Sequence, residues 1–214
     1  MIAYISIHYM SILQAVIEHL RLTILALLCS IPLAFLLFLV LFLTPKTIGT
    51  LLTGLLVTIY CIPSIALFTL LIPWFGLGEV TAIIGLTAYN QILLIRNIRA
   101  SYDAIPRQIK EAAESLGISS RKCFQHIYLP LMLPYLIGGL RIVTISTMGI
   151  ATMAALINAG GLGRILVEGM RMFSMPRILV AVILISGLAL VLNFILIKLE
   201  RVARRYATGY EVTA

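Results

Sequence analysis

Five long apolar runs, separated by shorter polar segments, dominate the pattern of this chain. A helix needs about 20 mostly apolar residues to cross the hydrocarbon core of a membrane, and the runs approach that length with at most one charge each. We predict membrane-spanning helices at residues 22–43, 51–73, 80–96, 130–156 and 178–198. Because β-barrel strands alternate polar and apolar residues and these runs do not, the pattern predicts an all-α polytopic membrane protein with about five spans.

Residues 11–21 show an amphipathic pattern before the first span. Gln14, Glu18 and Arg21 fall on one helical face, and apolar side chains cover the other. This pattern is typical of a helix that lies in the membrane interface or against a neighbouring span. We therefore expect an N-terminal peripheral helix, a transmembrane domain and a cytoplasmic basic tail, at residues 1–21, 22–200 and 201–214.

The composition agrees with this pattern and narrows the classes of function. Hydrophobic residues make up 61% of the 214 residues and charged residues 11%, with a mean hydropathy of +1.09, so lipid is the solvent for most of the chain. The three cysteines are an odd number without metal-ligand spacing. Since the pattern contains no nucleophile, metal cluster or acid–base pair, we expect no catalytic residue and no metal or cofactor in this chain.

The Lys and Arg residues are unevenly distributed and predict an orientation. Residues 44–50, 96–127 and 198–214 hold eleven of the sixteen, and five spans would place these segments on one side. Four lie on the other side, and Arg141 lies within a span. Loops rich in Lys and Arg face the cytoplasm, so we predict an external N-terminus and a cytoplasmic C-terminus. The net charge of +8 is then an orientation signal, and we expect no nucleic-acid partner.

The basic segment between the third and fourth spans, residues 103–130, predicts two short helices joined by a glycine. Pro106 suits the first position of a helix that continues over residues 108–116, and Gly117 can take the left-handed conformation that ends it. A serine at position 119 or 120 can cap a second helix that runs to about residue 127. The result is a compact element projecting from the membrane.

This element has the contents of a docking surface. Ala112 and Ala113 are small enough for a partner to approach closely, and Glu111 offers a carboxylate to a partner donor. An ordinary hairpin with a solvated charged face is the alternative.

One motif in this segment resembles a known family. Glu111-Ala112-Ala113 is followed at fixed spacing by Gly117 and by Ile127-Tyr128-Leu129-Pro130. This matches the "EAA" loop of permease subunits of ATP-driven (ABC) importers. The resemblance implies that Glu111, Ala112, Ala113 and Gly117 belong to the coupling helix, which docks on an ATP-binding subunit.

Further segments are similar to the osmoprotectant branch of these permeases, which imports glycine betaine, carnitine, choline and related quaternary amines. They are Cys61-Ile62-Pro63-Ser64-Ile65-Ala66-Leu67-Phe68, Leu94-Ile95-Arg96-Asn97, Gly139-Leu140-Arg141, Gly149-Ile150-Ala151-Thr152 and Ala159-Gly160-Gly161-Leu162-Gly163. Leu94 replaces the usual proline, and the similarity spans about residues 22–200. Methionine-type permeases share the glycine loop and the coupling loop, so residues 61–68 and 94–97 favour the osmoprotectant branch over an importer of an amino acid such as methionine.

The resemblance also implies the assembly. ATP and Mg²⁺ would be bound by separate ATP-binding subunits, and a second permease subunit, identical or homologous, would complete the pathway. An extracytoplasmic binding protein would deliver the substrate, and the chain would be a multi-pass protein of a prokaryotic plasma (inner) membrane.

Polar residues inside predicted spans are candidates for the translocation pathway, because they are costly in hydrocarbon unless they face protein or water. They are Tyr60, Ser64, Asn90, Gln91, Arg141, Thr144 and Thr147. For each hydroxyl or amide, a hydrogen bond between helices is the alternative. Pro63 and Pro73 are expected to bend the second span and free carbonyls toward a cavity.

Arg141 has no carboxylate within any predicted span. We therefore expect its guanidinium to find carbonyls, an aqueous cavity or a second permease subunit, or to lie near the cytoplasmic interface.

The loop at residues 157–177 is predicted to lie outside, where Gly160, Gly161 and Gly163 permit sharp turns. It is expected to form an outer gate, to meet the binding protein, or to be a connector buried against neighbouring helices.

A self-sufficient secondary carrier is the competing class of function. The absence of a phosphate-binding G-x-x-x-x-G-K-[ST] motif fits both classes, because the importer's ATPase is a separate chain. The absence of Asp and Glu from the predicted spans favours an external energy source over a coupling-ion site.

Overall fold

The computed structural model describes residues 2–208, and every regular element within them is a helix. In chain order these are α1 (Ile2–Leu43), α2 (Lys46–Cys61), α3 (Ser64–Phe75), α4 (Glu79–Asp103), α5 (Arg107–Ser115), α6 (Ser120–Cys123), a π-helix (Phe124–Tyr128), α7 (Leu129–Ala151), a 3₁₀ helix (Met153–Ile157), α8 (Leu162–Arg171) and α9 (Met175–Thr208). The predicted all-α fold class is confirmed.

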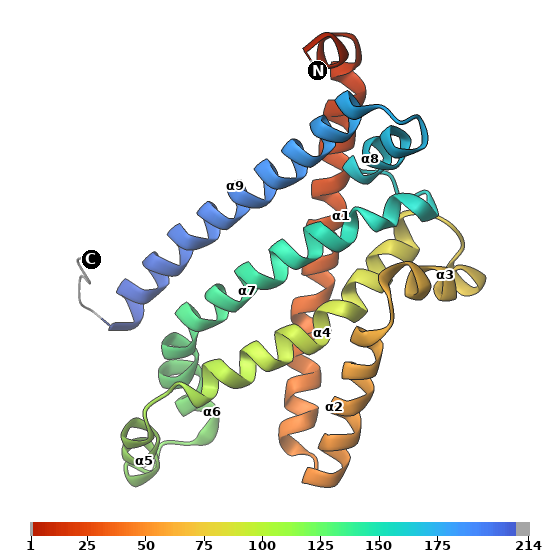
Figure 1. Ribbon diagram of the computed structural model, residues 1–214. Coiled ribbons are helices and arrows are strands. Elements are labelled where there is room, and N and C mark those ends of the chain that lie inside the picture. The colour runs from red at the N-terminus through yellow and green to blue at the C-terminus, as the bar shows by residue number, and fades with distance from the viewer. Residues whose placement is uncertain (1, 209–214) are drawn as a thin grey trace.

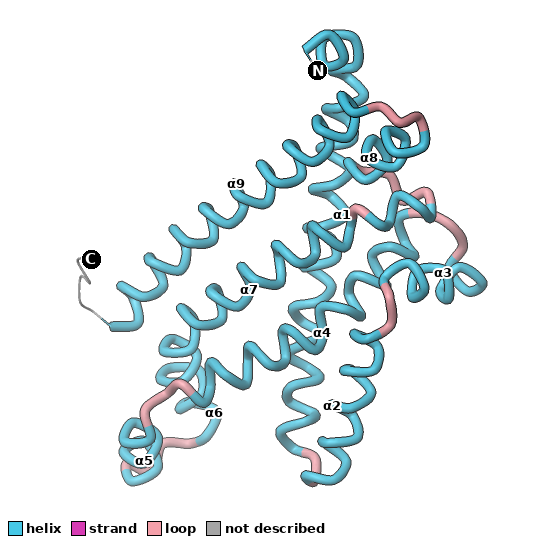
Figure 2. Tube along the Cα trace, in the orientation of Figure 1, coloured by secondary structure: helices cyan, strands magenta, loops and turns pink. Residues whose placement is uncertain are grey.

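Long helices packed side by side form the body of the molecule (Figure 1). α1 packs against α4, α4 against α7, and α7 against α9. The N-terminus and α8 lie at one end, whereas the turn between α1 and α2 lies with α5 and α6 at the opposite end. Figure 2 shows that short loops connect the helices.

Three helical stretches within residues 2–208 are long and apolar enough to cross a membrane, and the bent pair α2–α3 would be a fourth. The three are Tyr4–Leu43, Arg121–Ala151 and Met175–Ala207. α4 is more polar, but it extends between the same two ends as its neighbours α1 and α7 (Figure 1). The orientation in the membrane and the count of five crossings stay predictions.

The expected separate helix at residues 11–21 is instead the first half of α1. α1 continues from Ile2 to Leu43 with non-helical angles only at His8. The polar face does not lie free, because the Glu18 carboxylate accepts the backbone N–H of Gly161 at 2.9 Å. The polar residues that predicted a peripheral helix therefore contact the remainder of the chain.

The second predicted span, residues 51–73, is broken into α2 and α3. The two helices are bent by 103° at Ile62–Pro63. The expected bend at Pro63 is confirmed, since proline cannot donate the backbone hydrogen bond that would continue α2. No break occurs at Pro73, which lies inside α3.

The remaining boundaries differ by part of a helix. α4 extends beyond the predicted residue 96 to Asp103, and α7 ends at Ala151, where the 3₁₀ helix follows. α9 continues to Thr208, so most of the expected basic tail belongs to the last helix. Residues 209–214 of that tail lie outside the described residues.

Several small side chains face the interior of the bundle, together with a few large ones such as Leu22 and Phe68, and many large apolar side chains face outward. On α1, Ala15 and Ala26 are fully buried, whereas Leu28 and Leu43 are 61% and 74% exposed. Lipid is as apolar as leucine, so large side chains lose nothing by facing it, while small ones let helix backbones approach. α3 is held in the same way, because a Cβ on Gly85 of α4 would lie 2.6 Å from the ring of Phe68.

Candidate functional site

The candidate coupling loop, residues 103–130, has the predicted helix–glycine–helix form. Pro106 precedes α5, and Gly117, two residues after the end of α5, takes a left-handed φ of +64°. No atom lies within 4 Å of the position that a Cβ on Gly117 would occupy. The backbone conformation, and not lack of space, therefore requires glycine here.

The inner face of α5 is attached to the helical bundle. Ala113 is only 3% exposed and Ile105, just before the helix, 4%. The Lys110 ammonium lies 4.0 Å from the centre of the Tyr102 ring and donates to the Tyr102 carbonyl at 2.9 Å. Ala113 thus faces its own chain, which differs from the expectation that both alanines are available to a partner.

The outer face of α5 is open. Ala112 is exposed, and the Glu111 side chain is 58% exposed while it pairs with Arg107 at 2.6 Å. Leu116 at the tip is 75% exposed. Sequence reasoning missed Leu116, although an apolar residue directly before the loop glycine in a polar helix was a usable signal. Glu111, Ala112 and Leu116 form one surface at the end of the molecule.

The second half of this segment runs into α7 with little interruption. α6 continues as the π-helix Phe124–Tyr128, which enters α7 at Leu129, with Pro130 in the first turn of α7. Cys123, the last residue of α6, is only 4% exposed. A nearly continuous helical path therefore joins α6 to α7, whereas the turn at residues 116–119 separates α6 from α5.

Four of the predicted pathway residues are buried in the bundle. Asn90 is 1% exposed, Gln91 2%, Thr144 4% and Thr147 0%. The Thr147 hydroxyl donates to the Asn90 amide oxygen at 2.9 Å, and the Asn90 nitrogen donates to the Ser30 hydroxyl at 3.1 Å. These bonds link α4 to α7 and α1. Ser30, which the sequence analysis missed, completes this polar cluster.

The neighbouring candidates lie where the second span breaks. The Tyr89 hydroxyl donates to the Ile62 carbonyl, which the break at Pro63 leaves without a helical partner. Tyr60, 40% exposed, packs edge-to-face on Tyr89 with ring centres 6.0 Å apart. Ser64, in the first turn of α3, is partly exposed. The structure therefore separates a buried polar cluster from an aromatic pair in which Tyr60 is exposed and Tyr89 is buried.

Arg141 pairs with a carboxylate that the sequence analysis placed outside the spans. Its guanidinium lies 3.3 Å from Glu200 of α9, which also lies 3.2 Å from Arg204. The predicted fifth span ends at residue 198, so the sequence pattern does not identify Glu200 as a partner within the spans. This partner within the same chain is none of the four expected arrangements, and the depth of Arg141 in the membrane stays a prediction.

The glycine loop before α8 is packed tightly against α1 and α7. Gly160 and Gly161 have positive φ values of 80° and 76°. A Cβ on Gly163 would lie 2.1 Å from the carbonyl oxygen of Thr152. Of the three expected roles, this geometry fits a connector buried against neighbouring helices.

Similarity to known proteins extends over most of the chain. A family model described as "binding-protein-dependent transport system inner membrane component" matches residues 26–205. The osmoprotectant import permease protein OsmW of Salmonella typhimurium is 30% identical over 181 residues, 82% of each chain. The choline transport system permease protein OpuBB of Bacillus subtilis is 29% identical over 184 residues, 86% of this chain and 84% of the relative.

The fold is shared with solved transporter structures. A chain of the MetNI methionine ABC transporter, in an inward-facing conformation, superimposes with a TM-score of 0.84 at 20% identity and covers 92% of this chain and 97% of that chain. The resemblance that the sequence motifs carried is confirmed, and the secondary-carrier alternative is set aside. The chain belongs to the family of inner-membrane components of binding-protein-dependent transport systems.

Proposed function

We propose that this chain is the permease subunit of an ABC importer for a quaternary-amine osmoprotectant such as glycine betaine, carnitine or choline. It forms the translocation pathway together with a second permease subunit, and an extracytoplasmic binding protein delivers the substrate. Two ATP-binding subunits bind and hydrolyse ATP with Mg²⁺ and drive the transport cycle.

The coupling role is carried by one observation, the exposed face of α5. Glu111, Ala112 and Leu116 project from the end of the bundle, and the inner side of the same helix is fixed by Ala113 and Lys110. A helix that is held on one side by a few contacts and exposed on the other suits a docking element. Movement of the ATP-binding subunits would displace α5, and the helical path through α6 would pass the displacement to α7.

The substrate class rests on the relatives' names and on the motif at the broken span. Relatives named for osmoprotectant and choline transport match more than four-fifths of the chain. The 61–68 segment, which distinguishes this branch, forms the 103° bend between α2 and α3. Tyr60 and Ser64 are partly exposed beside this bend. Their exposure supports a position on the pathway, whereas the buried Asn90–Thr147 cluster holds α1, α4 and α7 together.

Reconstituted transport tests the proposal. The chain is placed in liposomes with its ATP-binding subunits and binding protein, and ATP-dependent uptake of labelled glycine betaine, carnitine, choline and methionine is compared. We expect ATP-dependent uptake of the quaternary amines, and we expect added methionine to inhibit this uptake only weakly. Methionine as the preferred substrate would contradict the substrate class, and gradient-driven uptake by this chain alone would contradict the permease role.

Two variants test the coupling loop separately. Glu111→Arg should abolish substrate-stimulated ATP hydrolysis while membrane insertion is kept. Because Glu111 also pairs with Arg107 within α5, the swap Arg107→Glu with Glu111→Arg serves as a matched control that preserves an i,i+4 pair. We expect the swap to stay uncoupled. If it restored coupling, the role of Glu111 would be to stabilise α5 and not to contact the motor subunit.

A further inference from the structure

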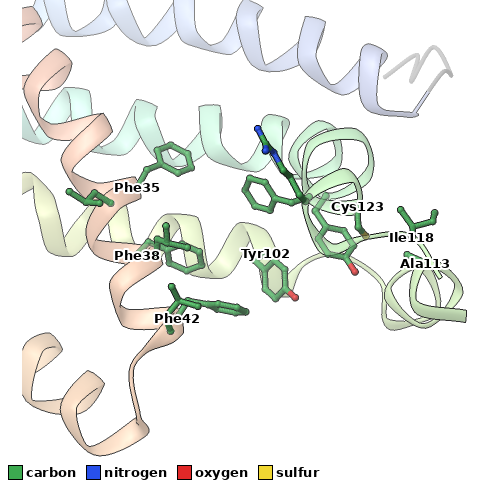
Figure 3. A pocket seen from close by; sticks show the side chains of 13 residues that line it. Phe35, Phe38, Phe42, Tyr102, Ala113, Ile118 and Cys123 are labelled. Atoms are coloured by element: carbon green, nitrogen blue, oxygen red, sulfur yellow. The ribbon is translucent and has the colours of Figure 1, made fainter. Parts of the chain in front are cut away.

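A hollow of about 720 Å³ lies between the last turns of α1 and the candidate coupling loop. Figure 3 shows Phe35, Phe38 and Phe42 projecting from α1 toward Tyr102, with Ala113, Ile118 and Cys123 on the opposite side. Its volume is within the range of small-molecule sites, about 300–1,000 Å³. Nothing in the proposed transport mechanism uses this hollow.

The lining of the hollow is apolar and aromatic. Tyr102 packs edge-to-face on Phe42 and on Tyr128, with ring centres 6.0 Å and 5.8 Å apart. Among the described lining residues Arg121 carries the one formal charge, and none is a carboxylate. The chemistry that fits is a long apolar chain attached to an anionic group.

The hollow is continuous with the lipid-facing side of α1. Leu36, Leu39 and Leu43 line it, and they are 58%, 51% and 74% exposed on a helix long and apolar enough to cross a membrane. Large apolar side chains exposed on such a helix face hydrocarbon. An acyl chain can therefore enter from the bilayer without crossing water.

The charge distribution identifies the leaflet. Lys46, Arg121 and Lys122 lie at this end of the molecule, which the excess of basic residues assigns to the cytoplasm. The cytoplasmic leaflet carries anionic lipids, and basic pockets between helices on that side bind their headgroups.

We propose that this hollow binds an anionic phospholipid of the cytoplasmic leaflet, with one acyl chain among the aromatic rings and the phosphate paired with Arg121. Ala113 and Ile118 belong to the candidate coupling loop and form one wall. The bound lipid would thus set the position of this loop relative to α1. The binding itself does not depend on the identity of the transported substrate.

Photolabelling of the full chain in vesicles tests the site. The chain is placed in phosphatidylethanolamine vesicles with trace photoactivatable phosphatidylglycerol or, as the zwitterionic probe, photoactivatable phosphatidylcholine, and labelled peptides are mapped by mass spectrometry. Phosphatidylglycerol should preferentially label residues 35–43 and 118–128. Arg121→Gln should lower the preference for the anionic probe about fivefold, the effect of one basic residue at an anionic surface.

Matched variants distinguish the hollow from general surface charge. Lys122→Gln removes the same charge from the adjacent exposed position, which does not line the hollow, and should change the preference less than Arg121→Gln does. Leu39→Trp fills the hollow and should lower labelling by both probes. Circular dichroism and gel filtration check that the variants keep their helices and size.

Three results would overturn the proposal. The first is equal labelling by the two probes in the unmodified chain, and the second is an equal loss of preference in the Arg121 and Lys122 variants. The third is loss of labelling when a second copy or the ATP-binding subunit is added, because a protein would then cover the hollow.

Discussion

Two glycine-containing loops at opposite ends of the molecule use glycine for different reasons. Gly117, between α5 and α6, has a left-handed φ of +64° and open space around its missing Cβ. Gly163, which follows the turn at Gly160–Gly161, has the Thr152 carbonyl oxygen 2.1 Å from its missing Cβ. Conformation alone requires glycine at position 117, whereas packing requires it at position 163, beyond the positive φ values of Gly160 and Gly161.

The difference indicates what each loop can do. The loop around Gly117 presents exposed groups from a scaffold that is fixed only on its inner side, as a docking element must. The Gly160–Gly163 loop is held by α1, through Glu18, and by the end of α7. An element packed on several sides cannot move independently, so the second loop can shift only together with the helices that it joins.

Gly163→Ala should have the largest effect on this contrast. A new Cβ would collide with backbone, which cannot rotate away as a side chain can. We expect destabilisation of about 3 kcal/mol, the upper range for overpacking, seen as a lower unfolding temperature in detergent. Ser30→Ala on α1 provides a comparison in which the hydroxyl that accepts the Asn90 hydrogen bond is lost and no collision is introduced. An unchanged unfolding temperature for Gly163→Ala would contradict the tight packing.

Glu18→Ala should have the next largest effect. The Gly161 N–H loses a charged acceptor at 2.9 Å, and hydrogen bonds to charged groups contribute about 1.5–3 kcal/mol. Glu18→Gln keeps an acceptor oxygen and should lose less. Equal thermal unfolding of both variants and the unmodified chain would show that the contact contributes nothing to stability.

The sequence predicts the local structure of the first loop, but it does not predict the packing of the second. The first loop is local: Pro106, a helical stretch and Gly117 are enough to specify a helix, its end and a second helix. The packing of the second loop depends on Glu18, 143 residues away from Gly161, and no single-sequence pattern reports such a pairing. The same limit hid the Ser30 contact with Asn90.

The spans show a similar division. Apolar runs located the helices, because hydropathy responds to lipid directly. Their ends were less certain, since Arg and Glu side chains within a helix end at the interface look like loop residues. For this reason the predicted fifth span ends at residue 198, before Glu200, and the prediction gives Arg141 no carboxylate partner. The sequence predicts a bend at Pro63 but not its angle of 103°. The angle depends on long-range packing, because α3 contacts α4.

Gly117→Ala should have a smaller effect than either change in the buried loop. An alanine in the left-handed conformation is disfavoured by about 1–2 kcal/mol, and no collision adds to this, because the surrounding space is open. Gly117→Asn should be milder still, since asparagine adopts this conformation more readily. Unfolding temperatures of the two variants test this order. Destabilisation equal to that of Gly163→Ala would mean that Gly117 is packed and not open.

Leu116→Ser should have the smallest effect on stability and should separate docking from folding. The side chain is 75% exposed, and substitutions at such surface positions change stability by less than about 0.5 kcal/mol. If Leu116 contacts the ATP-binding subunit, the substitution removes apolar burial at that interface, and stimulation of ATP hydrolysis should fall while the unfolding temperature stays the same. Gln108→Ser, at an exposed position on α5, is the control and should keep full stimulation. Equal stimulation in both variants would remove Leu116 from the docking surface and leave Glu111 and Ala112 to form it.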